Sequence, residues 1–254
     1  MKLYLTFGCH KKISLPTHYN HIMQAAILNW IEDEEYQKFI HDIGYVYEGR
    51  SFKLFTFSKL MGKYTLTDNK KEMIFEGKVK IIISSSQVRF IECLEKSLRD
   101  PSKVWQLGRN EVNIISISKE EEPLVGHEIV VRSLSPVVAY NTILEKDKKK
   151  TKYYGPEDIE FENILRQNLI KKYKSIVEMN PSLKMEEFTE NDFKITVLKP
   201  KMLSKAIVYY KGFVIVGFNG QFKLQGHPIL LQLALEAGLG GKNAQGFGCI
   251  QYIK

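Results

Sequence analysis

The sequence contains few cysteines: Cys9, Cys93 and Cys249 are the three in 254 residues. An odd number without C-x-x-C spacing is not the pattern of a disulfide framework or of a cysteine-rich zinc site. Free cysteines are typical of reducing compartments, where disulfides rarely persist. We therefore predict a cytoplasmic protein that has no structural disulfide and binds no metal ion.

The sequence also lacks a long hydrophobic run. The most apolar stretch, residues 206–218, is interrupted by Lys211 and is shorter than the ~20 residues that a membrane-spanning helix needs. The N-terminus becomes polar at Lys11 and Lys12, too early for a signal peptide. Because 44% of the residues are hydrophobic and 26% are charged, we expect a soluble globular protein without a membrane partner.

Acidic residues are outnumbered by basic ones. The chain has 29 Asp and Glu against 37 Lys and Arg, which gives a formal net charge of +8. A basic excess favours polyanionic partners, with nucleic acid ahead of an anionic membrane. Composition alone leaves open the alternative that the charge only keeps the protein in solution.

Glycines concentrate near the C-terminus in residues 238–248, GLGGKNAQGFG, which we call the glycine-rich loop. It has five glycines, one lysine and no acidic residue. Successive N–H groups beside Lys242 could form a nest for an anion, whereas the alternative is a tight connection in which Gly238 ends a helix. Two nucleotide-binding loops are excluded, because G-x-G-x-x-G requires glycine at Asn243 and a Walker loop requires serine or threonine after Gly-Lys.

The first 122 residues show alternating strand and helix patterns. Residues 50–58 predict a buried central strand, because apolar residues occupy both of its faces. In order, we expect a strand at 2–7, helices along 22–31 and 36–43, strands at 50–58 and 73–84, a helix at 88–98, and one or two strands within 104–118. This order is the βαββαβ plan of a ferredoxin-like domain.

A second set of patterns follows the acidic residues 120–122, where we place a domain boundary. Residues 146–152 form a basic segment that we expect to be mobile and solvated, with a phosphate contact as the alternative. Asn219-Gly220 predicts a hairpin turn. The expected elements are a strand at 127–140 interrupted at Pro136, a helix from 155 to about 173, strands at 193–198 and 206–218, a helix from Pro228 and a strand at 249–253.

Together these patterns predict an α+β protein with two tandem ferredoxin-like domains, residues 1–122 and 123–254, the second of which carries the glycine-rich loop. Lysines and aromatic residues interleave along the strands of the second domain. Such sheets suit RNA, because phosphate contacts provide affinity and aromatic stacking holds the bases.

His41 is a candidate proton donor. It lies off the apolar stripe of its helix and in the last turn before Gly44, where the helix C-terminus favours a protonated imidazole. The alternative is a surface histidine without a role. Lys53 opens the predicted strand at 50–58, where its ammonium can reach water.

Three segments resemble the CRISPR-associated repeat-RNA endoribonucleases, the Cas-six family of the RAMP superfamily. The glycine-rich loop follows the family pattern of Gly-hydrophobic-Gly, five residues, Gly-hydrophobic-Gly, as Gly238-Leu-Gly240 and Gly246-Phe-Gly248. LPTHYNHIMQAAILNWI resembles the family's first helix. HDIGYVYEGRSFKLFTFSKL resembles its histidine-bearing helix end and the strand that follows.

The resemblance implies cleavage of precursor CRISPR RNA without metal or cofactor. The RNA's own 2′-OH attacks the adjacent phosphorus and leaves 2′,3′-cyclic phosphate and 5′-OH ends. His41 would be the acid or a proton shuttle, and Lys53 would stabilise the developing negative charge. Some members have a tyrosine in the first helix, where this chain has Leu28; Tyr47 is the candidate replacement, followed by Tyr45 and Tyr36, unless all three only pack.

The resemblance also implies repeat RNA as the partner and leaves open a homodimer and an association with other CRISPR effector subunits. The residues expected to bind RNA are Gly238, Gly240, Gly241, Lys242, Asn243, Gln245, Gly246 and Gly248. Two alternatives remain: a RAMP-type subunit that holds RNA without cutting it, and a tandem ferredoxin-like sensor of a small ligand.

Overall fold

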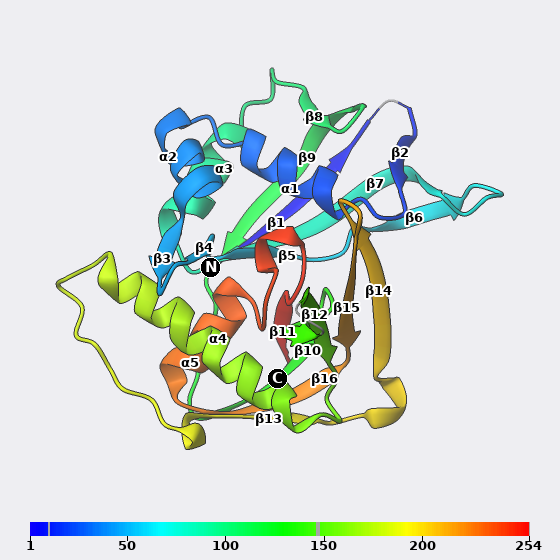
Figure 1. Cartoon of the computed structure of the whole chain (residues 1–254). Helices are drawn as coiled ribbons and strands as arrows, with labels where there is room; N and C mark the ends of the chain where they lie inside the picture. Colours follow the sequence, from blue (N-terminus) through cyan, green and yellow to red (C-terminus); the bar gives the residue numbers. More distant parts are fainter. Residues whose placement is uncertain (10, 146–147, 254) are drawn as a thin grey trace.

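The computed structural model of the chain describes residues 1–9, 11–145 and 148–253. In Figure 1 the N-terminal half lies above the C-terminal half, and the red segment near the C-terminus reaches up between them to β5. Each half contains a β-sheet with helices packed against it. In the described part of the chain, no helix combines the length and the apolar character needed to cross a membrane.

The N-terminal sheet is built around β1, in which Leu3, Leu5 and Phe7 alternate into the core. Its strands are β1 (Lys2–Gly8), β2 (Ile13–Pro16), β5 (Phe55–Phe57), β6 (Met61–Leu66), β7 (Glu72–Ser85), β8 (Trp105–Leu107) and β9 (Asn110–Glu120). Within it, the antiparallel order β5-β7-β1-β9 is the strand order of a ferredoxin-like sheet.

The helices of this half are α1 (Asn20–Asn29), α2 (Glu34–Lys38) and α3 (Val88–Leu98), and a single π-helical turn (Phe39–Ile43) continues α2. A short hairpin of β3 (Tyr45–Tyr47) and β4 (Arg50–Phe52) follows this turn. α3 packs on β7 and β9 through Phe90, Ile91 and Leu94, as its helical spacing predicts.

The C-terminal sheet has the order β13-β16-β10-β17, which is again ferredoxin-like. Its strands and helices are β10 (Glu128–Ser133), α4 (Ile159–Glu178), β13 (Phe193–Val197), β16 (Gln221–Gly226), α5 (Pro228–Ala237) and β17 (Ile250–Ile253). Two hairpins are added, β11 (Ala139–Glu145) with β12 (Lys148–Tyr154) and β14 (Ser204–Tyr210) with β15 (Phe213–Asn219). The predicted α+β class with two ferredoxin-like units is confirmed; the boundary at residue 122 stays a prediction.

One predicted strand is wrong. Residues 50–58 are two short strands rather than one central strand, because Leu54 adopts a φ of 54° that breaks the extended backbone. β4 pairs with β3, and β5 pairs with β7. The break leaves Lys53 in the connection between two strands. Strand β6 was not predicted, since all of its residues are exposed.

The predicted hairpin turn at Asn219-Gly220 is also wrong, because β15 pairs with β14 and not with β16. The hairpin turn lies instead at Lys211 and Gly212, whose φ angles of 46° and 85° match a two-residue turn. Residues 148–152 belong to β12 rather than to a mobile segment, and residues 146 and 147 lie outside the described residues. Helix α4 begins and ends later than predicted.

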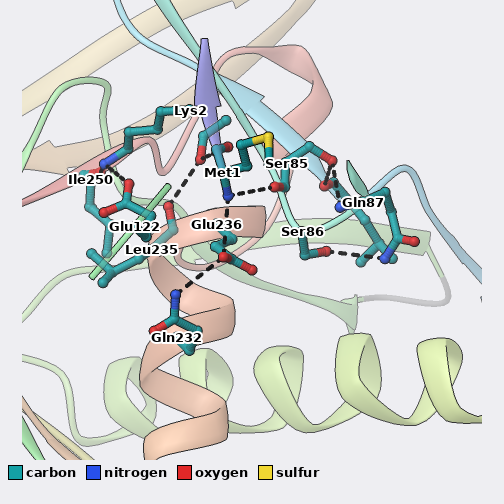
Figure 2. A network of polar contacts seen from close by, with 12 residues as sticks. Met1, Lys2, Ser85, Ser86, Gln87, Glu122, Gln232, Leu235, Glu236 and Ile250 are labelled. Carbon is teal, nitrogen blue, oxygen red and sulfur yellow. Dashed lines mark hydrogen bonds and ion pairs between the residues drawn. The ribbon is translucent and has the colours of Figure 1, made fainter. Parts of the chain in front are cut away.

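The two halves share one continuous hydrophobic core, which includes Phe57 from the first half and Leu239 from the second. Polar contacts also join them, as Figure 2 shows around Lys2. Its buried ammonium donates to Ile250 O at 2.9 Å and forms an ion pair with Glu122. Ser84 Oγ donates to Leu235 O at 3.1 Å. These contacts hold α5 and β17, the two elements that flank the glycine-rich loop, against the N-terminal sheet.

Candidate functional site

A cavity of about 600 Å³ lies between the two halves. It is lined from the N-terminal half by α1 and the β4–β5 connection, and from the C-terminal half by β11, α4 and the glycine-rich loop. Its cationic lining side chains are Arg50, Lys53, Lys172 and Lys242. None of the described residues that line it carries a carboxylate. A concave surface with one sign of charge attracts ligands of the opposite sign, so the cavity suits an anion.

Lys53 lies in the connection between β4 and β5 rather than at the opening of one strand, and this places it beside His41. Its Nζ donates a hydrogen bond to the main-chain oxygen of His41 at 2.9 Å. Burial lowers the pKa of Lys53, and the carboxylate of Asp42 opposes this shift. Gly44 (φ 70°), which lies between His41 and Lys53 in sequence, ends the π-helical turn. A Cβ at Gly44 would lie 2.6 Å from Phe52 O. The tight turn at Gly44 therefore brings the histidine and the lysine together.

The imidazole of His41 is exposed, as predicted, and does not line the cavity. It borders a neighbouring hollow together with Leu28 and Gln37. Its Nδ1 lies 2.7 Å from Asp42 Oδ1, and this contact lowers the pKa of the Asp42 carboxyl. Asp42 was missed by the sequence interpretation, although a carboxylate next to a candidate histidine is a visible pattern. The pair can orient the imidazole and hold its proton on Nδ1.

The three candidate tyrosines lie apart from the cavity. Tyr47 packs beneath Lys174, whose Nζ is 5.4 Å from the ring centroid. Tyr45 is buried and donates to Gln87 Oε1 at 2.9 Å. Tyr36 is buried against Phe39. Leu28, which stands where some family members have tyrosine, does border the hollow beside His41.

The glycine-rich loop divides into lining and scaffold residues. Gly241, Lys242, Asn243 and Gln245 line the cavity, whereas Gly238, Gly240, Gly246 and Gly248 belong to its buried support. The N–H groups of Leu239, Gly241 and Gly248 already donate to main-chain carbonyls at 2.8–2.9 Å. An anion nest in this loop cannot include those three groups.

The loop is anchored to the N-terminal half at its far end. Asn20 Nδ2 donates to Gln245 O at 2.8 Å, and Thr56 Oγ1 donates to Phe247 O at 2.8 Å. Gly246 has a φ of 83°, and a Cβ there would collide with the ring of Phe57. Glycine is required at this position by both its conformation and its contact. The loop is thus a joint between the two halves.

Lys242 has a left-handed conformation, with a φ of 60°, at the turn of the loop. Its Nζ lies 4.7 Å from the ring centroid of Tyr140, a cation–π distance. Burial lowers the pKa of Lys242. A phosphate group in the cavity would restore the electrostatic stabilisation that this ammonium loses on leaving water.

Lys172 on α4 was missed by the sequence interpretation. Its side chain is fully buried, and its Nζ donates to Gly238 O at 2.6 Å and to Gly240 O at 3.2 Å. Burial lowers the pKa of Lys172 to about 7, while the two carbonyl acceptors favour its protonated form. The available indication was its position, three residues after Leu169 on the apolar stripe of the helix.

Within the described residues, no three His, Cys, Asp or Glu side chains gather as ligands of a metal ion. The lining of the cavity is instead cationic and amide-rich, with Gln24, Asn141, Asn168, Asn243 and Gln245 among the described residues. These side chains can exchange hydrogen bonds with sugar hydroxyls, phosphate oxygens or base edges.

Comparisons with known proteins show which proteins the chain is similar to. A family model described as "CRISPR associated protein Cas6, C-terminal" matches residues 118–252. The chain is similar to "CRISPR-associated endoribonuclease Cas6 1" of Methanocaldococcus jannaschii, with 26% identity over 248 residues that cover 94% of this chain and 88% of the relative.

Two solved structures show the same fold. A Cas6-related protein of Pyrococcus furiosus has a TM-score of 0.80 at 21% identity, covering 100% of this chain and 98% of the other. A RAMP protein described as binding different RNA substrates has a TM-score of 0.78 at 23% identity, covering all of both chains. At these identities the likeness concerns the arrangement of the two ferredoxin-like units.

Proposed function

Because the chain belongs to the Cas6 family of CRISPR-associated proteins, we propose that it is an endoribonuclease that cleaves precursor CRISPR RNA within the repeats. The observation that carries the proposal is the cavity between the halves. Its cationic lining suits a phosphodiester chain, and Lys53 joins it directly to the segment that bears His41. The similar M. jannaschii protein bears the name of an endoribonuclease, which supports the same activity here.

The proposed reaction is metal-independent and uses the ribose as its nucleophile. The 2′-OH gives its proton to a base, which is solvent water or the third group, while its oxygen bonds to the adjacent phosphorus and the bond from phosphorus to the 5′ oxygen breaks. His41 gives a proton to the leaving 5′ oxygen, and Lys53 stabilises the negative charge on the phosphorane oxygens. Products carry 2′,3′-cyclic phosphate and 5′-OH ends. Tyr47 stays our candidate for the third group.

The proposed path of the RNA follows from the charges. The backbone would contact Lys242 and the lining amides of the glycine-rich loop inside the cavity, pass Lys53 at its edge, and reach His41 in the adjoining hollow. Binding would then belong mainly to the C-terminal half and cutting to the N-terminal half. The homodimer and the association with other effector subunits stay predictions.

A second candidate is an RNA-holding subunit that does not cut. The observation in its favour is the exposed His41 imidazole, which is bonded to Asp42 and borders a hollow separate from the cavity. Under this alternative the cavity binds repeat RNA, and replacement of His41 changes nothing in the fate of that RNA.

The decisive experiment incubates purified protein with its repeat RNA in the presence of a chelator. One RNA is unmodified, and the other carries a single 2′-deoxy sugar at the cut. The proposal predicts that only the unmodified RNA is cut and that its 5′ fragment ends in a cyclic phosphate. Cutting of the deoxy RNA, or a strict requirement for metal, would refute the mechanism. Stable binding without cutting of either RNA would establish the second candidate.

A further inference from the structure

Lys172 is a buried ammonium whose two acceptors are main-chain oxygens of the glycine-rich loop, Gly238 O and Gly240 O. Both glycines are buried, and both have positive φ, 87° and 79°, a conformation that favours glycine. A buried carbonyl that loses its donor costs about 1–3 kcal/mol. Loss of this ammonium would therefore destabilise the start of the loop in its present conformation.

The helix that carries Lys172 also touches the N-terminal side of the site. Lys171 forms an ion pair with Glu48 at 2.5 Å, and Lys174 lies over the ring of Tyr47. Glu48 and Tyr47 belong to the β3–β4 hairpin and its turn, between His41 and Lys53 in sequence. Helix α4 thus contacts the hairpin of one half through two lysines and the glycine-rich loop of its own half through a third.

We propose that Lys172 is a positioning residue for RNA binding: the N–H groups of its buried Nζ hold the glycine-rich loop in the conformation that presents Lys242 to the cavity. The inference rests on the proposed function, since it assigns RNA as the ligand of the cavity. Lys172 itself is engaged by Gly238 and Gly240, so it acts through the loop and not on the phosphates. A leucine or methionine would fill the same space but would leave both carbonyls without a donor.

The first test needs no RNA. Amide hydrogen exchange is followed in Lys172→Met, with Lys96→Met as the control, because Lys96 is an exposed lysine on α3 whose replacement removes the same charge. We expect exchange at residues 238–248 to accelerate at least tenfold in Lys172→Met while the N-terminal sheet stays protected. Unchanged exchange in the loop would overturn the proposal.

The second test measures the affinity for repeat RNA that is blocked by 2′-deoxy at the cut, as a function of salt. Loss of one phosphate contact lowers the slope of log Kd against log salt by about 0.7–0.9. We expect Lys172→Met to bind about tenfold more weakly and with this smaller slope, as Lys242→Met does, and the double variant to lose no more than either single variant. A merely structural role would leave the slope at the wild-type value and would add to the effect of Lys242→Met.

If Lys172→Met does not fold, Lys172→Gln carries the same measurements, because it removes the charge and keeps an N–H donor. We expect it to retain part of the loop protection and a slope closer to wild type; a fully protected loop combined with the reduced slope would contradict the positioning role. If the wild-type protein binds no RNA, the proposed function fails, whereas the exchange experiment still decides whether Lys172 orders the loop.

Discussion

The two sides of the candidate site are held in place in different ways. His41 lies on an exposed turn, and its link to Lys53 joins residues 12 positions apart. Most of the glycine-rich loop is buried, and it is held by Lys172, Thr56 and Asn20, which are 66 to 225 positions away from their acceptors. The proposed chemistry therefore lies on a local, solvated segment, whereas the proposed RNA contact depends on packing between distant parts of the chain.

The largest effect is expected from His41. His41→Ala should slow cutting by ~10²–10⁴-fold, the usual contribution of a general acid, and should leave the affinity for repeat RNA unchanged. Single-turnover cleavage and filter binding measure the two quantities, with Lys96→Met as the control. A variant that cuts at the wild-type rate would contradict the assignment of His41, and the exposed turn would then have no assigned part in cutting.

The next effect concerns the loop's dependence on packing. Gly246 and Gly49 both have positive φ, 83° and 69°, but a Cβ at Gly246 would meet Phe57, whereas no described atom lies within 4 Å of a Cβ at Gly49. We expect Gly49→Ala to cost about 1 kcal/mol from backbone strain and Gly246→Ala to cost about 3 kcal/mol, because crowding adds to the strain. Urea unfolding measures both. Equal losses would mean that the contact with Phe57 contributes nothing.

The pH dependence of stability should report the buried lysine. Folding lowers the pKa of Lys172 from 10.5 to about 7, so between these values the unfolded chain holds more protons than the folded one. Rising pH therefore favours the folded state in this window, by at most about 1.4 kcal/mol per pH unit. Urea unfolding at pH 7, 8 and 9 should show that wild type gains stability relative to Lys172→Met. A constant difference between the two proteins would contradict the shift.

The smallest effect is expected from Asp42. Its side chain and that of His41 are largely exposed, so the pair resembles a surface ion pair, whose contribution is small because water screens it. Asp42→Asn should therefore slow cutting by no more than about fivefold, and RNA affinity should not change. A loss as large as that of His41→Ala would show that the function of His41 depends on the Asp42 carboxylate far more than an exposed ion pair allows.

Local sequence was sufficient for much of the fold and for one side of the site. The β-rich residues 2–7 predicted the opening strand, which is β1, and the helical pattern of residues 88–98 predicted α3. His41 lies off the apolar stripe and is exposed, as predicted. These features depend on neighbours along the chain, which is why the pattern of residues reveals them.

Contacts distant in sequence explain most of what was wrong or missed. At Leu54 the chain leaves the β3–β4 hairpin and pairs with β7 as β5, a change of partner that strand propensity does not reveal. The hairpin of β14 and β15 is local, and its turn at Lys211 and Gly212 was missed because Asn219-Gly220 is the stronger turn pattern. The role of Lys172 could not be predicted, because its two acceptors lie 66 and 68 positions away. A lysine on an apolar helical stripe indicates a buried partner but does not identify it.

We propose a division in which the glycine-rich loop binds RNA and the segment with His41 and Lys53 cuts it. The cleavage rate of Lys242→Met at saturating RNA is the measurement that tests it. If the loop only binds, this variant should need about ten times more RNA to saturate, which corresponds to the loss of one charged contact of about 1.5 kcal/mol. Its rate at saturation should equal that of wild type. A saturated rate that falls as far as that of His41→Ala would show that the loop takes part in the chemistry, and it would contradict this division.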